Sequence, residues 1–125
     1  MKASQIMTTK VVKVEANTPV KEICRILISH KVSGVPVVDG ENNLLGFVSE
    51  RDIISNVGER GFLNKRALDV MNKDVIAVEK DASSEEIIQI FMNKPYRYIP
   101  VVKKGKLVGI ISRKDLIDHL MLGYY

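Results

Sequence analysis

The sequence predicts an α/β fold of the α+β kind, made of two copies of one β-α-β-β-α repeat. The first observation is that residues 34–52 return in similar form at residues 98–115. The second is the spacing, because Pro36 and Pro100 lie 64 positions apart whereas the glycines of the following strands lie 63 apart. The one-residue difference falls between two apolar runs, where a hairpin turn tolerates changes in length.

The repeat predicts how the chain is divided. We expect a first repeat at residues 1–61, a connector at residues 62–69 and a second repeat at residues 70–125, together forming one compact module. A period of about 60 residues is longer than solenoid units, and two copies are too few for an open array. We therefore expect the repeats to pack through their sheets around a pseudo-twofold axis, which covers otherwise exposed edges and faces.

In the first repeat, a short strand and a helix are expected before the hairpin. Residues 11–14 alternate loosely enough for a short strand, and Asn17 with Pro19 supplies a cap followed by proline at the first helical position. Apolar residues then recur with helical spacing, which predicts one buried face. This face consists of Val20, Ile23, Cys24 and Leu27. We expect Ser33-Gly34 to end the helix.

The hairpin of the first repeat is predicted from two apolar runs around a turn. Residues 35–38 and 44–48 supply the strands, and residues 39–43 supply the polar residues and glycine typical of turns. A second helix is expected from Ser49, and the two glycines within residues 58–61 should break it.

The second repeat is expected to follow the same order. Residues 75–78 repeat the first strand, and residues 83–86 form a capping box that begins a helix ending at Pro95. A second hairpin follows. The last helix is expected at residues 112–122, with Gly123 after it.

Composition limits the classes of protein to which the chain can belong. With 125 residues, 46% of them apolar, the chain is long enough to bury a core of its own. No apolar run approaches the ~18 residues of a membrane span, and the N-terminus lacks the apolar stretch of a secretory signal. The single cysteine, Cys24, excludes an internal disulfide and fits a reducing cytoplasm. We therefore expect a soluble cytoplasmic protein in which Cys24 packs in the core.

The charge pattern favours a small anionic ligand over nucleic acid. The net charge is +4 and the pI is 9.2, but the basic residues are scattered and no aromatic platform is interleaved with them. His30 and His119 lie in different repeats without partners at ligand spacing, so no metal site is expected. No nucleophile elbow, P-loop or dinucleotide-binding glycine run occurs, which argues against an enzyme.

Two matching tetrads, Ser49–Asp52 and Ser112–Asp115, are the candidate binding elements. Each follows a strand and begins a helix, so one interpretation is a capping box that satisfies free backbone N–H groups. The other interpretation is a ligand site, because an ionised carboxylate accepts hydrogen bonds from two adjacent hydroxyls such as those of ribose. The cations within the tetrads either reach phosphates or remain solvated. They are Arg51, Arg113 and Lys114.

The doubled frame resembles a tandem pair of CBS domains, the Bateman module. The frame reads G-V-P-V-V followed by G-x-x-S-x-x-D, with I-M-T, V-V-K-V and T-P-V before it in the first repeat and V-M-N and V-I-A-V in the second. The resemblance covers nearly the whole chain, which leaves no room for an attached catalytic domain. It implies a stand-alone, non-catalytic regulatory module that requires no cofactor and binds AMP, ADP, ATP or S-adenosylmethionine in clefts between the repeats. An energy-sensing role and a homodimer, with Leu116, Leu120 and Met121 at its interface, are further expectations, together with a regulated protein of unknown identity.

The resemblance also implies two composite ligand sites, in which the motif aspartate holds ribose. The first site would comprise Lys10, Val12, Ser33, Gly34, Val35, Pro36, Ser112, Lys114 and Asp115. The second would comprise Asp74, Ile76, Arg97, Tyr98, Ile99, Pro100, Ser49, Arg51 and Asp52.

The two sites differ, because Ser33-Gly34 of the first repeat becomes Arg97-Tyr98 in the second. Tyr98 either stacks on adenine or fills its cleft, and Arg97 either pairs with phosphates or stays in solvent. Gly34 permits a close backbone approach, so we expect the first site to be the occupied one. The rival hypothesis is a purely structural protein–protein interaction module, in which both tetrads are helix caps and no small molecule binds.

Overall fold

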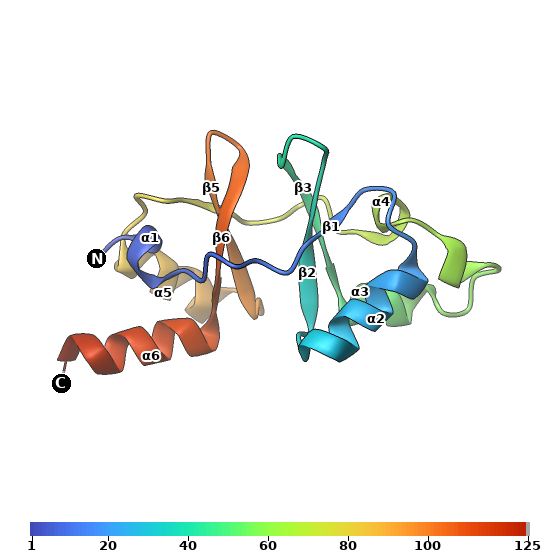
Figure 1. The fold of residues 1–125 in the computed structure, drawn as a ribbon. Coiled ribbons are helices and arrows are strands. Elements are labelled where there is room, and N and C mark those ends of the chain that lie inside the picture. The colour runs from blue at the N-terminus through green and yellow to red at the C-terminus, as the bar shows by residue number, and fades with distance from the viewer. Residues whose placement is uncertain (125) are drawn as a thin grey trace. The chain divides into compact units, whose positions relative to one another are not determined.

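The computed structural model describes residues 1–124 and shows a mixed α/β architecture with two three-stranded sheets (Figure 1). The chain forms two compact units, and one of them combines segments from both ends of the sequence. Unit 1 comprises Met1–Val11 and Ile76–Tyr125, and unit 2 comprises Val12–Val75. Tyr125 itself lies outside the described residues. The predicted α/β fold with two similar repeats is confirmed. The division of the sequence into two repeats joined by a connector at residues 62–69 stays a prediction.

Unit 2 contains the body of the first repeat and the segment that precedes the second. Its elements are β1 (Val14–Glu15), α2 (Val20–His30), β2 (Gly34–Val38), β3 (Leu44–Ser49), α3 (Glu50–Asn56), the 3-10 helix η1 (Phe62–Asn64) and α4 (Ala67–Val70). The sheet order is β1-β2-β3, with β1 parallel to β2 and β3 antiparallel to it. The expected strand-helix-strand-strand-helix order is therefore confirmed.

Unit 1 contains the first residues of the chain and the body of the second repeat. Its elements are α1 (Ala3–Ile6), β4 (Val78–Glu79), α5 (Ser84–Asn93), β5 (Tyr98–Lys103), β6 (Lys106–Ser112) and α6 (Arg113–Tyr124). The sheet order β4-β5-β6 repeats that of unit 2, and a register shift lies between equivalent valines in both hairpins. Val38 pairs with Leu44 in the first hairpin and Val102 with Leu107 in the second, and the second pair encloses one residue fewer, as predicted.

Short arms at the start of the two repeats, residues 1–11 and 67–75, complete both sheets in the same way. In unit 1, Thr8 forms an antiparallel bridge with Ile110 of β6, and the chain just before α1 is bonded to the start of α5, where the Ser84 N–H donates to the Met1 carbonyl (Figure 1). In unit 2, Asn72 forms the corresponding bridge with Phe47 of β3. Each unit therefore combines the arm of one repeat with the body of the other.

Each unit has its own apolar core. In unit 2, α2 buries Val20, Ile23 and Leu27 against the sheet, while Cys24 is half-buried at the edge of this cluster. In unit 1, the core lies between α1, α5, α6 and the sheet. Its buried residues are Ala3, Ile6, Val78, Ile87, Ile99, Val101, Ile111 and Leu116. The predicted face of α2 is confirmed, but Leu116 belongs to the core of unit 1 and is not left over for a second copy.

Several predicted boundaries are corrected. The strands expected at residues 11–14 and 75–78 shrink to Val14–Glu15 and Val78–Glu79, because only these pairs reach the hydrogen-bonding register of the neighbouring strand. The helix α2 begins at Val20, one position after the predicted start at Pro19, and Pro19 is its N-cap. The cap at Ser83, whose hydroxyl accepts from the Glu86 N–H, and the end of α5 before Pro95 are confirmed.

The ends of two helices also differ from the prediction. Lys31 ends α2 by adopting a left-handed conformation, so Gly34 is free to begin β2. At the other end of the chain, α6 continues through Gly123, since one glycine costs a helix only about 1 kcal/mol. Among residues 1–124, no helix combines the length and the apolar character that crossing a membrane requires.

Candidate functional site

The Ser112–Asp115 tetrad of unit 1 lies where β6 passes into α6 (Figure 1). Asp115 Oδ2 accepts a hydrogen bond from the Ser112 backbone N–H at 2.8 Å, and Ser112 Oγ accepts one from the Asp115 N–H at 3.0 Å. Thr8 Oγ1 donates to Asp115 Oδ1 at 3.2 Å. Each carboxylate oxygen of Asp115 thus accepts one of these bonds, and each has a second lone pair for another donor.

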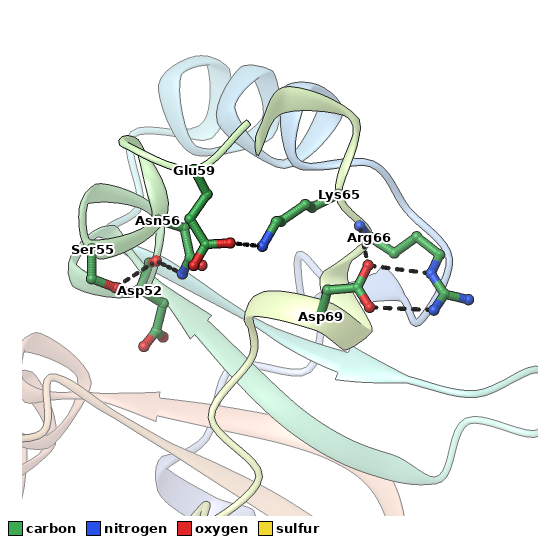
Figure 2. Close-up of polar contacts among 7 residues, drawn as sticks. All are labelled: Asp52, Ser55, Asn56, Glu59, Lys65, Arg66 and Asp69. Carbon is green, nitrogen blue, oxygen red and sulfur yellow. Dashed lines mark hydrogen bonds and ion pairs between the residues drawn. The ribbon is translucent and has the colours of Figure 1, made fainter. Parts of the chain in front are cut away.

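The Ser49–Asp52 tetrad of unit 2 is held differently. Asp52 Oδ2 accepts from both the backbone N–H and the hydroxyl of Ser49, at 2.8 and 3.0 Å. Figure 2 shows that the carboxylate of Asp52 points away from Ser55 and Asn56, which donate to the Asp52 carbonyl. Within the described part of the chain, no side chain from outside the tetrad bonds this carboxylate. Asp52 therefore acts as a cap for α3.

Both tetrads are capping boxes, so the structural interpretation of each is confirmed in geometry. Asp115 does more than cap its helix, because its carboxylate also accepts from Thr8 and so connects α6 to the arm that carries Thr8. Sequence reasoning missed Thr8. The two residues are 107 positions apart, and the only available signal was that Thr8 follows Ile-Met, a pair that the second repeat matches with Val-Met.

The residues of the two predicted sites are distributed over both units. Unit 1 holds Lys10, Ser112, Lys114 and Asp115 of the first site, and Ile76, Arg97, Tyr98, Ile99 and Pro100 of the second. Unit 2 holds Val12, Ser33, Gly34, Val35 and Pro36 of the first site, and Ser49, Arg51, Asp52 and Asp74 of the second. The composition of each site stays a prediction.

Within each unit, strand pairing brings some of these residues together. In unit 1, Tyr98 pairs with Ser112, and the Arg97 carbonyl accepts from the Arg113 N–H at 3.3 Å. In unit 2, Gly34 pairs with Ser49, and the Ser33 carbonyl accepts from the Glu50 N–H. The residue pair at the start of each β-hairpin therefore lies beside the tetrad that follows the same hairpin.

Packing inside unit 2 accounts for the glycine at position 34. A Cβ atom there would meet the ring of Phe47 on the neighbouring strand, together with the carbonyl oxygen of Val48. The small size of Gly34 therefore has a cause in its own sheet, and a ligand is not needed to explain it.

The two histidines make their contacts outside the tetrads. His30 contacts the Ile26 carbonyl at the end of α2, and His119 contacts the sulfur of Met1. No cluster of three metal-ligating side chains occurs among the described residues. An open cavity of about 410 Å³ lies in unit 2, beside the hairpin turn at Asp39 and the first turns of α2. None of the predicted site residues lines it.

Comparison with protein-family models identifies the family of this chain. The family model described as CBS domain matches the chain twice, at residues 3–59 and at residues 67–122. The chain belongs to the CBS domain family. The resemblance to a tandem pair of CBS domains is thus confirmed, and the second match begins with α4, inside the predicted connector.

Relatives of this CBS domain pair differ greatly in length. An uncharacterized 17.7 kDa protein of Acidianus ambivalens is 34% identical over 121 residues, which are 96% of this chain and 73% of the relative. The inosine-5'-monophosphate dehydrogenase of Methanocaldococcus jannaschii is 29% identical over 119 residues, which are 94% of this chain but only 23% of the dehydrogenase. CBS domain pairs therefore occur as a small part of larger proteins, whose activities are not carried over to this chain.

Solved structures match the whole fold. The crystal structure of CBSX2 in complex with AMP is 26% identical, with a TM-score of 0.90, and the match covers 99% of this chain and 98% of CBSX2. A CBS-domain containing protein from Agrobacterium tumefaciens is also 26% identical, with a TM-score of 0.82 and coverage of 96% and 99%. Both likenesses extend over the two repeats.

Proposed function

We propose that this CBS domain pair is a non-catalytic regulatory module that binds an adenosine-containing ligand through the Ser112–Asp115 tetrad. The observation that carries the proposal is the carboxylate of Asp115, which is oriented by Ser112 and Thr8 while each of its oxygens keeps a lone pair. Two neighbouring hydroxyls of a ribose would fit these lone pairs. The AMP bound to CBSX2, a structure that matches this chain over nearly its full length, supports an adenine nucleotide as the ligand.

In this proposal the protein acts by transmitting ligand binding to another protein in the cytoplasm. A ligand shifts conformation or assembly only if it binds the two states with unequal affinity. A homodimer is the assembly we propose, because α6 exposes Ile117, Met121 and Leu122, with Leu122 83% accessible. Such a module would report the balance of adenine nucleotides and so sense the energy state of the cell. Sedimentation of the protein with and without AMP tests this part, and a 14.0 kDa species under both conditions would contradict it.

Isothermal titration calorimetry with AMP, ADP, ATP, adenosine and S-adenosylmethionine tests binding directly. We expect Asp115→Asn to lower the affinity for the nucleotide by about tenfold or more, since a charge-assisted hydrogen bond contributes ~1.5–3 kcal/mol. Asp52→Asn is the matched control, because it removes the same charge from the other capping box. Heat-induced unfolding of both variants separates a lost cap from a lost ligand contact. Undiminished binding by Asp115→Asn would show that the site lies elsewhere.

The structural interaction module remains the second candidate, and the capping geometry favours it. Both aspartates accept a hydrogen bond from the backbone N–H of the serine just before their own helix, and this role alone would account for both tetrads. Calorimetry separates the two candidates, because an interaction module without a small-molecule site would show no heat of binding with any member of the nucleotide series.

A further inference from the structure

The two tetrads stand on equivalent scaffolds, which allows a comparison position by position. Equivalent backbone bonds join Arg113 to Arg97 in unit 1 and Glu50 to Ser33 in unit 2. The bridge between Thr8 and Ile110 likewise corresponds to the bridge between Asn72 and Phe47. The two tetrads are therefore flanked by the same backbone pairings, so the side chains at matching positions can be compared directly.

The charges at these matching positions differ in sign. In unit 1 the four matching positions within or flanking the tetrad and its arm are all cationic: Lys10, Arg97, Arg113 and Lys114. In unit 2 the matching positions beside Asp52 carry two acids, one neutral residue and one cation: Asp74, Ser33, Glu50 and Arg51. Two reversals, from lysine to aspartate and from arginine to glutamate, account for most of the contrast.

Two nearby charges reduce the contrast without removing it. Lys73 adds a cation to unit 2 where unit 1 has Thr9, and Asp118 adds an acid to unit 1 one helical turn beyond Asp115. With both included, unit 1 still has four cations against two acids around its tetrad, and unit 2 has two cations against three acids. The net sign is therefore opposite in the two units.

The cations of unit 1 are available to a ligand. All four are exposed, and no ion pair involves any of them within residues 1–124. The Nε of Arg113 donates to the Tyr96 carbonyl at 3.1 Å, which orients its guanidinium group while its two terminal nitrogens make no hydrogen bond within the described chain. A guanidinium group held in this way suits a phosphate, which accepts two parallel hydrogen bonds from it.

We infer that the unit 1 tetrad selects phosphorylated adenosine ligands, namely a nucleoside mono-, di- or triphosphate, over adenosine itself and over S-adenosylmethionine. The inference rests on the proposed function, since it assumes that Asp115 holds the ribose. The four cations around Asp115 then attract the phosphates, and they repel the sulfonium group of S-adenosylmethionine. The acids around Asp52 act in the opposite sense, so the two tetrads of one chain differ in the charge of ligand they accept.

Calorimetric titration of the full chain with adenosine, AMP and S-adenosylmethionine tests the inference. We expect AMP to bind about tenfold more tightly than adenosine, and S-adenosylmethionine to bind no better than adenosine. Raising the salt concentration from about 50 to about 500 mM shortens the electrostatic screening length about threefold. This change should lower the affinity for AMP and leave the affinity for adenosine unchanged. Equal affinity for AMP and adenosine would overturn the inference and leave the proposed function standing, whereas no binding of either would overturn both.

A charge-exchange variant locates the effect. Lys10→Asp with Arg113→Glu gives two of the four positions in unit 1 the charges of their counterparts in unit 2, and we expect it to abolish the tenfold preference for AMP over adenosine. The control is Lys21→Glu with Lys103→Asp, which changes the net charge equally at exposed lysines away from the tetrads. Circular dichroism confirms that each variant is folded. A preference for AMP that survives the exchange, or that the control abolishes equally, would refute the role of these cations.

Discussion

Thr8 donates a hydrogen bond from its Oγ1 to Oδ1 of Asp115, across 107 positions of the sequence. This bond joins the first arm of the chain to the helix that follows the last strand. At the matching place in unit 2, Asn72 accepts from the N–H of Asp74 and does not bond Asp52. The arms thus have the same backbone pairing in both units, but only the arm in unit 1 orients a carboxylate of a tetrad.

Replacing Thr8 by valine tests whether this orientation matters for binding. Thr8→Val keeps the branched shape and removes the hydroxyl, so we expect nucleotide affinity to fall by about three- to tenfold, as one hydrogen bond contributes ~0.5–1.5 kcal/mol. Because Thr8 is exposed, the free energy of unfolding should change by less than about 0.5 kcal/mol. The control is Thr9→Val, a neighbouring exposed threonine that makes no side-chain bond among the described residues. Equal losses of affinity in both variants would contradict the role of the bond.

The contact between each arm and its sheet predicts a difference between two glycines. At Gly46, an added Cβ would lie 2.7 Å from the Asn72 carbonyl oxygen, which is backbone that the strand bridge holds in place. At Gly109, the atoms in the way belong to the side chain of Met7. We expect Gly46→Ala to destabilise the protein by about 1–3 kcal/mol and Gly109→Ala by less, since a flexible methionine can move aside.

Urea unfolding of both glycine variants measures this difference. Gly40→Ala is a suitable control, because a Cβ there meets nothing within 4 Å and the residue lies in an exposed turn. If Gly46→Ala were as harmless as Gly40→Ala, the arm of unit 2 would not be held against β3 as tightly as the bridge indicates.

The sequence predicted the repeat and most of the helices because these depend on local patterns. The helical spacing of Val20, Ile23 and Leu27 and the cap at Ser83 are visible without any tertiary contact, and the structure confirms both. The short strands were predicted too long, because the strand at Val14 and Glu15 is defined only by its pairing with β2. The partner of Asp115 was missed for the same reason. No local rule indicates that an arm at Thr8 reaches a helix at the other end of the chain.

The ion pair between Arg66 and Asp69 predicts a local response to acid. Arg66 donates to Asp69 from its side chain and from its backbone N–H, and these bonds hold the pKa of the Asp69 carboxyl below its ordinary value of 3.8 (Figure 2). A carboxyl whose pKa is lowered on folding stabilises the fold above the ordinary pKa, and this contribution is lost as the pH falls below that value.

Carbon-detected NMR titration measures the Asp69 pKa directly. We expect the Asp69 resonance to titrate below pH 3.8 in the parent protein and to move toward that value in Arg66→Gln, which removes the side-chain donors. Because Asp69 is exposed, added salt should reduce the difference between the Asp69 pKa of the parent protein and that of Arg66→Gln. An unchanged pKa in Arg66→Gln would assign the shift to the backbone N–H alone.

The left-handed residue at the end of α2 predicts that a glycine there stabilises the protein. Lys31 has φ 54° and ψ 44°, a conformation that costs a residue with a side chain about 1 kcal/mol and that glycine adopts freely. We expect Lys31→Gly to raise the free energy of unfolding by up to about 1 kcal/mol, reduced by the greater freedom of glycine in the unfolded chain. Lys21→Gly provides the matched control, because this exposed lysine lies inside the same helix, where glycine destabilises by about 1 kcal/mol. Thermal unfolding should therefore shift in opposite directions for the two variants, and a loss of stability in both would mean that α2 does not end at Lys31 in solution.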